Sequence, residues 1–276
     1  MRTMALLKLL LLMLWLGLAT SSELHRQRRV IGGATCGTTE RLYHVKLEAT
    51  GGGSTGRCGG SLISPQWILT AAHCWKPGRT MSATVGVHPG PGEQPQVITE
   101  HHIFQDQNRR SHDIMLLKLP NRLPDRSALV ALPDCRTPPT LGDCVRAAGY
   151  ASDRMGPNNR RIPGESRTLQ CANFDIVDCT NLRNIMNIDA QDPLNIFAQA
   201  TRYQHWFCIQ SPGKDICLGD SGGGVEYDHK IYGVISFTGS LRLACTQAAG
   251  IMDVCRYIDW IKETIKEPRC KLNCIG

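Results

Sequence analysis

Three short segments of the sequence carry side chains that together could perform nucleophilic catalysis. The first, TAAHC, contains His73; the second, DIMLLKL, begins with Asp113; the third, GDSGGG, contains Ser221. A serine hydroxyl is a weak nucleophile at neutral pH unless a base lies within hydrogen-bond reach, and that base needs an acid to orient it. His73 alone would be an ordinary half-buried histidine, and Asp113 alone a solvated carboxylate. Together they predict a Ser-His-Asp arrangement that transfers an acyl group.

The glycines around Ser221 meet a second requirement of acyl transfer. Gly219 and the glycines after Ser221 allow a tight turn that points the amides of Gly219 and Ser221 at one oxygen atom, where they would form an oxyanion hole. The order His, Asp, Ser along the chain is one of the known orders for this geometry. In these motifs and in their order, the chain resembles the chymotrypsin/trypsin family of serine proteases.

The resemblance implies an all-β fold of two six-stranded antiparallel β-barrels followed by a C-terminal α-helix. Short apolar runs separated by turn residues, such as YHVKLEA, the GGGS turn and KIYGVISF, agree with many short strands. The apolar spacing of Tyr257, Ile261 and Ile265 predicts the helix. The expected bounds are about 30–135 for the first barrel, about 136–255 for the second and about 256–267 for the helix. The poorly patterned segment 192–205 is expected to be a surface loop near the cleft.

The first 29 residues predict export. A basic start, an apolar run over residues 6–18 and small residues after it form a secretory signal peptide over residues 1–21. The apolar run is shorter than the ~20 residues that a membrane-spanning helix needs. The sequence therefore predicts a secreted, extracellular protein without a membrane span, and a peptidase domain over residues 30–276.

Residues 22–29 are expected to be an activation propeptide, because the basic sequence RQRR ends at Arg29 and VIGG follows. VIGG resembles the mature N-terminus of the family. The resemblance implies that cleavage after Arg29 frees an α-ammonium group on Val30, which then pairs with Asp220 and orders the oxyanion hole. Neither buried charge would be tolerated without the other. The RQRR motif resembles a proprotein convertase site, so a convertase is a candidate activating partner.

Asp215 precedes Ser221 by six residues, at the position that the resemblance assigns to the floor of the primary specificity pocket. The alternative is a solvated turn residue. A carboxylate in a narrow slot is costly unless a cation meets it, and a substrate arginine is its natural complement. The resemblance assigns further substrate contacts to Ser236, Phe237, Thr238 and Gly250. Ile216 and Thr238 depart from the family pattern by their bulk, so arginine is expected over lysine, with low turnover of general substrates.

Thirteen cysteines in an exported chain predict disulfides rather than a metal site. The resemblance implies five pairs: Cys36–Cys171, Cys58–Cys74, Cys135–Cys255, Cys179–Cys208 and Cys217–Cys245. Cys144, Cys270 and Cys274 are left over. Either a tail cysteine reaches Cys144, or the tail cysteines pair locally and leave Cys144 as a buried thiol, or the tail forms an intermolecular bond.

Composition narrows the partners. The formal net charge of +7 falls to about +3 without residues 1–29, and no basic block is interleaved with aromatic residues, so nucleic acid is not an expected partner. The pairs Arg109–Arg110 and Arg160–Arg161 are interpreted as solvated loop residues. The expected activity is that of a serine endopeptidase made as a zymogen, with protein or peptide substrates, serine protease inhibitors as candidate partners, and no cofactor or metal. The alternative is a protease-like binding protein of the same fold with weak or no catalytic activity.

Overall fold

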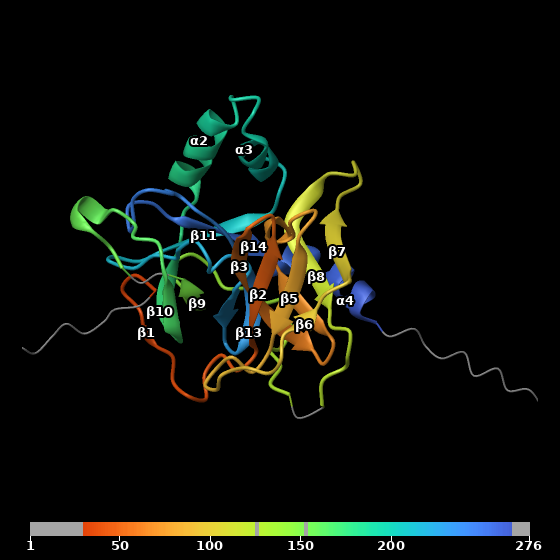
Figure 1. The fold of residues 1–276 in the computed structure, drawn as a ribbon. Helices are drawn as coiled ribbons and strands as arrows, with labels where there is room; N and C mark the ends of the chain where they lie inside the picture. Colours follow the sequence, from red (N-terminus) through yellow and green to blue (C-terminus); the bar gives the residue numbers. More distant parts are fainter. Residues whose placement is uncertain (1–29, 125–126, 152–153, 267–276) are drawn as a thin grey trace, which may run out of the picture.

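The computed structural model describes residues 30–124, 127–151 and 154–266. The predicted signal peptide, the propeptide with Arg29, and the tail cysteines Cys270 and Cys274 lie outside the described residues. Figure 1 shows two sheets side by side, one from the first half of the chain (orange to yellow) and one from the second (green to blue). No described helix is long and apolar enough to cross a membrane.

The first half folds into one antiparallel sheet with the strand order β6-β5-β2-β3-β4-β8-β7. Its strands are β2 (His44–Gly51), β3 (Ser54–Ser64), β4 (Trp67–Thr70), β5 (Thr80–Thr84), β6 (Gln96–Val97), β7 (Glu100–Gln105) and β8 (Ser111–Lys118). The predicted GGGS turn joins β2 to β3. Gly52 and Gly53 both have positive φ there, as a two-residue hairpin turn requires. On β2, Val45, Leu47 and Ala49 alternate with more exposed residues and face the core.

The second half forms a closed barrel of six strands. The strands are β9 (Cys144–Ala151), β10 (Glu165–Val177), β11 (Trp206–Gln210), β12 (Gly224–Tyr227), β13 (Lys230–Thr238) and β14 (Ala249–Asp253). The barrel closes because β10 pairs with both β11 and β9, and the short strand β1 (Ala34–Thr35) pairs with β10 as an edge. The predicted all-β fold is confirmed. The first sheet differs in detail, because it has seven strands and curls without pairing its edge strands β6 and β7.

The C-terminal helix is confirmed as α4 (Ile258–Ile265), which follows the 3-10 helix η3 (Val254–Tyr257). Ile261 and Tyr257 are buried against the core, whereas Lys262 and Glu263 face solvent.

The prediction of a loop over residues 192–205 is wrong in part. Two further helices, α2 (Thr180–Asp189) and α3 (Ile196–Thr201), project together at the top of Figure 1, and α3 lies inside that segment. Asn195 caps α3 by accepting a hydrogen bond from the Ala198 amide at 3.0 Å. A helix this short has no clear periodicity in the sequence, which explains why the pattern did not reveal it.

Four of the five expected disulfides are confirmed: Cys36–Cys171, Cys58–Cys74, Cys135–Cys255 and Cys179–Cys208. The fifth, Cys217–Cys245, is wrong for this structure, in which both residues are free thiols. The Cys217 sulfur instead accepts a hydrogen bond from Arg161 Nη1 at 3.2 Å, and the Cys245 backbone is bound to Asp215. Cys144 has no disulfide partner among the described residues and is exposed, so it is not the buried thiol of the second alternative.

The three free thiols are expected to differ in reactivity. Cys144 is exposed and should be alkylated by a maleimide in the native protein. Cys217 is buried, and burial raises the pKa of its thiol to about 12, so it should react only after unfolding. Peptide mapping after native and denatured alkylation measures both. Recovery of a Cys217–Cys245 disulfide peptide from a non-reducing digest would contradict the assignment.

Candidate active site

The structure brings His73 and Asp113 into direct contact. His73 lies in the 3-10 helix η1 (Ala72–Cys74), just after β4, and Asp113 lies on β8, which pairs with β4. The His73 ring Nδ1 is 2.8 Å from Asp113 Oδ2, and the His73 backbone amide donates to Asp113 Oδ1 at 2.8 Å. The carboxylate therefore holds both the ring and the backbone of His73. This contact favours the tautomer with the proton on Nδ1, which leaves Nε2 free to act as a base.

Asp113 is buried and is held from the second barrel as well. The Ser236 hydroxyl donates to Asp113 Oδ2, and the Asp113 amide donates to the Gln204 side-chain oxygen at 2.9 Å. Ser236, which lies on β13, was predicted to be a substrate contact from the family resemblance. Its hydroxyl has the additional role of orienting the acid.

Ser221 lies on the loop between β11 and β12 and lines the same cleft of about 660 Å³ as His73. Backbone hydrogen bonds hold this loop between the two sheets. Gly59 of β3 donates to the Ser221 carbonyl at 2.7 Å, and Gly222 donates to the Ile235 carbonyl at 2.7 Å. Gly222 has a φ of +80°, and a Cβ there would lie 2.1 Å from Thr70 Oγ1, so only glycine fits.

The predicted oxyanion-hole amides are available. Among the residues that the structure describes, neither the Gly219 amide nor the Ser221 amide donates a hydrogen bond. Gly219 has a φ of +112°, a backbone conformation that glycine readily adopts. Two unpaired amides beside a serine can stabilise an oxyanion in a tetrahedral intermediate.

Asp220, adjacent to the serine, is buried at 1% exposure. Its carboxylate accepts hydrogen bonds from the Ala151 and Cys217 amides, both at 2.9 Å. Burial raises the pKa of this carboxyl to about 6. Val30 and Ile31 are buried nearby in the fold, and the Ile31 carbonyl accepts from the Asp215 amide at 3.0 Å. Because Val30 is still joined to Arg29 in this chain, the ion pair between Val30 and Asp220 stays a prediction.

Asp215 is buried at 4% exposure, and its carboxylate already has a cationic partner within the chain. Arg161 Nη2 lies 2.5 Å from Asp215 Oδ2, and the Cys245 amide donates to the same oxygen at 2.7 Å. Burial raises the pKa of the Asp215 carboxyl, and the Arg161 charge opposes that rise. The interpretation of Asp215 as a solvated turn residue is therefore excluded.

The expectation that Arg161 is a solvated loop residue is wrong. Its side chain is only 8% exposed, whereas the adjacent Arg160 is exposed. All five N–H groups of the guanidinium have acceptors. Besides Asp215, the acceptors are the Ile216 carbonyl (2.7 Å), Cys217 Sγ (3.2 Å), Thr238 Oγ1 (2.7 Å) and the Ser240 carbonyl (2.9 Å). Nothing in the spacing of the sequence signals this contact, which joins two loops 54 residues apart.

The other predicted substrate contacts lie along β13 and its neighbour. Phe237 and Thr238 line the cleft, and Thr238 contacts Arg161. Gly250 pairs with Phe237 in the sheet, and a Cβ at Gly250 would lie 2.1 Å from the Phe237 ring. Gly250 is therefore required by that ring. Ile216, expected to narrow the slot, packs in the core of the second barrel and also lines the cleft, and its carbonyl binds Arg161.

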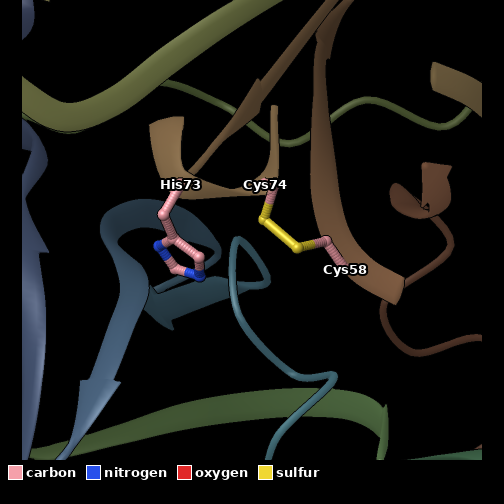
Figure 2. Close-up of side chains that lie close together, drawn as sticks. All are labelled: Cys58, His73 and Cys74. Atoms are coloured by element: carbon pink, nitrogen blue, oxygen red, sulfur yellow. A yellow bond between two sulfur atoms is a disulfide. The ribbon is translucent and has the colours of Figure 1, made fainter. Parts of the chain in front are cut away.

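His73 also lies beside Cys58 and Cys74, as Figure 2 shows, and one potential ligand atom from each falls within 4.8 Å of the others. The two sulfurs form a disulfide. Disulfide sulfurs are not thiolates, and thiolates are the sulfur ligands that metals bind in proteins. This group of residues therefore does not fit a metal ion.

Comparison with known proteins agrees with this geometry. The family model described as Trypsin matches residues 30–261. The chain is 30% identical to a snake venom serine protease, KN13, from Trimeresurus stejnegeri, over 89% of this chain and 88% of that protein. It is 29% identical to Trypsin-4 of Rattus norvegicus, over 94% and 99% of the two chains. A crystal structure of an inactivated protease paralogue from the scabies mite has the same fold, with a TM-score of 0.65 and 20% identity, covering 86% of this chain and 97% of that one.

Gly149 offers a test of the buried Asp220. A Cβ at Gly149 would lie 1.8 Å from Asp220 Oδ1, so Gly149→Ala must displace the carboxylate and the neighbouring amides. In protein cleaved before Val30, this variant should react with a fluorophosphonate at least about tenfold more slowly, because oxyanion-hole donors contribute that much or more. The control is Gly56→Ala, whose nearest neighbour would be 3.6 Å away. Equal labelling of both variants would show that the buried Asp220 carboxylate does not hold the oxyanion-hole amides in place.

Proposed function

Because the chain belongs to the trypsin family of serine proteases, we propose that it is a secreted endopeptidase, made as an inactive precursor, that cleaves peptide bonds after arginine. The observation that carries the proposal is the contact of His73 with a buried Asp113, in the same cleft as Ser221. The proposal includes the domain organisation expected from the sequence. Residues 1–21 would direct export, residues 22–29 would be removed, and residues 30–276 would form the peptidase.

The reaction proceeds through an acyl-enzyme. Ser221 Oγ attacks the substrate carbonyl while His73 Nε2 takes the hydroxyl proton, and the Gly219 and Ser221 amides bind the resulting oxyanion. His73 returns the proton to the leaving amine as the peptide bond breaks. A water molecule then attacks the ester, again with His73 as the base, and Ser221 is restored. Asp113 keeps the ring oriented and stabilises the imidazolium in both steps.

The preference for arginine is supported by the chemistry of the Asp215 recess. Within the chain, this recess satisfies every N–H of a guanidinium with a carboxylate, two hydrogen-bonding side chains and two carbonyls. An ammonium group has three donors and no planar fork, so lysine would satisfy fewer of these acceptors. The recess is therefore better matched to arginine.

The requirement for activation is supported by the environment of Asp220. Its buried carboxylate has two amide donors but no cation among the ion pairs of the described residues. A freed Val30 ammonium would supply the missing charge and fix the adjacent amides. The RQRR sequence before Val30 makes a proprotein convertase the candidate activator during secretion. Serine protease inhibitors remain candidate partners of the active form.

A second candidate function is a binding protein of the same fold with weak or no catalytic activity. The observation that favours it is the occupation of the Asp215 recess by Arg161, because a substrate arginine cannot enter while Arg161 is there.

Labelling and substrate profiling together decide between the two functions. Protein cleaved before Val30 should react with a fluorophosphonate at Ser221. The reagent needs an activated serine, but it does not have to place a group in the Asp215 recess. Ser221→Ala is the control and should not be labelled. A peptide library should then be cut after arginine. Absence of label on cleaved, folded protein would reject the protease and support the binding protein.

Asp220 also predicts how stability depends on pH. Its pKa rises from 3.8 to about 6 in the folded state, so the folded precursor binds the proton more tightly than the unfolded chain. Stability is therefore lost as pH rises from about 4 to about 6, by about 3 kcal/mol when fully developed. In the cleaved form, the Val30 ammonium should oppose this loss.

The measurement is the thermal midpoint of Ser221→Ala protein at pH 5 and pH 7.5, uncleaved and cleaved. Groups whose surroundings are the same in the two forms contribute equally to both and cancel in the comparison. The uncleaved form should lose more stability between the two pH values. The same pH dependence in both forms would contradict the pairing of Val30 with Asp220.

A further inference from the structure

Arg161 occupies the site that the proposed function assigns to the substrate. We infer that Arg161 is a specificity-determining residue, the resting ligand of the Asp215 recess, which a substrate arginine displaces only when flanking apolar residues also bind the cleft. The inference rests on the proposed function for its substrate and adds a rule of selection to it. Extended polypeptides with apolar residues near the arginine would be accepted, and isolated basic residues would be rejected.

Every N–H group of the Arg161 guanidinium has a hydrogen-bond acceptor. Its fork meets Asp215 and Thr238 through Nη2, the Ile216 carbonyl and the Cys217 sulfur through Nη1, and the Ser240 carbonyl through Nε. The charge pair is shielded, with side-chain exposures of 8% for Arg161 and 5% for Asp215. The attraction within a buried, hydrogen-bonded ion pair is much stronger than the attraction within a solvent-exposed ion pair.

The backbone around Arg161 holds the side chain in place. The Arg161 amide donates to the Arg242 carbonyl at 3.0 Å, and the Ala244 amide donates to the Asn159 carbonyl at 2.8 Å. These bonds join the loop of residues 154–162 to the loop of residues 239–248, which also carries Ser240. Backbone hydrogen bonds therefore fix the chain both at Arg161 and two residues before it, at Asn159. Arg161 is therefore built into the wall of the recess.

Competition follows from charge. One carboxylate, from Asp215, serves the recess, and its Oδ2 already accepts hydrogen bonds from Arg161 and the Cys245 amide. A second guanidinium entering beside the first would meet a like charge in a poorly solvated space, which is strongly unfavourable. A substrate arginine and Arg161 therefore exclude each other.

Exchange of one guanidinium for another gives little net binding energy. The arginine that enters gains about the same hydrogen bonds that the Arg161 side chain gives up. A substrate with no other contact to the protein would therefore bind weakly. Binding energy from parts of a substrate remote from the reacting bond can offset such a rearrangement.

The cleft next to the recess provides that remote binding. It is lined by Phe197 on α3, Leu218 beside Gly219, and Leu241 beside Ser240. Leu218 and Leu241 are 63% and 68% exposed, which is high for leucine in a folded protein. Burying apolar side chains of a substrate against them is favourable in proportion to the area removed from water. Helix α3 therefore contributes one wall of the surface that selects the extended substrate.

The test compares Arg161→Ala with the matched control Arg160→Ala, both in protein cleaved before Val30. Arg160 is the adjacent residue of the same loop, and its side chain is exposed. The first readout is the binding of p-aminobenzamidine, an aromatic amidine that needs an empty carboxylate recess but no catalysis. Its affinity should rise at least tenfold in Arg161→Ala and stay within twofold of wild type in Arg160→Ala.

The second readout is the ratio of kcat/KM for an extended peptide with apolar residues before arginine to kcat/KM for a single-residue arginine amide. This ratio should fall at least tenfold in Arg161→Ala, mainly through a lower KM for the small substrate. Fluorophosphonate labelling of Ser221 should be the same in wild type and both variants. A general effect on the triad would change the labelling rate, whereas relief of competition would not.

The outcomes separate this inference from the proposed function. If no form is labelled, the protease function fails, and amidine binding still decides whether Arg161 competes for the recess. If labelling is normal and Arg161→Ala binds the amidine no more tightly than wild type, the inference is overturned. Should Arg161→Ala melt far below wild type, Arg161→Gln is measured instead. This variant keeps the aliphatic start of the side chain and a polar end group and removes the charge, and the same tenfold increase in amidine affinity is expected.

Discussion

The burial of carboxylates is the constraint on which the rest of the site depends. Asp113, Asp215 and Asp220 are all nearly inaccessible to water, and a buried carboxylate is costly unless donors or a cation meet it. Each of the three carboxylates is stabilised by different partners. Asp113 binds His73 and Ser236, Asp220 binds two backbone amides, and Asp215 binds Arg161.

These three solutions lead to three functional consequences. The pairing of Asp113 with His73 fixes the base in the orientation that a serine nucleophile needs. The partly satisfied Asp220, with its raised pKa, leaves a place for a cation that cleavage before Val30 would create. The fully satisfied Asp215 places Arg161 in the recess that would otherwise select the substrate. The same rule of burial therefore connects catalysis, activation and selectivity.

Much of the fold and the site could be predicted from the sequence because the signals are local. The motifs around His73, Asp113 and Ser221 have fixed spacing, and the Gly52–Gly53 turn requires positive φ at adjacent positions. Four disulfides followed from a family resemblance that covers most of the chain. These features depend on residue type and order more than on distant packing.

The features that were missed depend on contacts between distant loops. Arg161 looks like any surface arginine until the 154–162 loop is placed against Asp215. In the same region the Cys217 sulfur accepts a hydrogen bond from Arg161, and the expected bond between Cys217 and Cys245 is absent. Helix α3 was missed because its apolar residues Ile196 and Phe197 face solvent and the cleft rather than a core. In each case, tertiary packing decided what the local sequence left open.

A crystal structure of the protein cleaved before Val30, without any ligand, would show directly how the buried carboxylates are paired. We expect the Arg161 guanidinium to lie on Asp215 and the Val30 ammonium to lie on Asp220, so that each buried carboxylate has its own partner. A structure in which Arg161 points into solvent and the Asp215 recess holds only water would contradict this expectation.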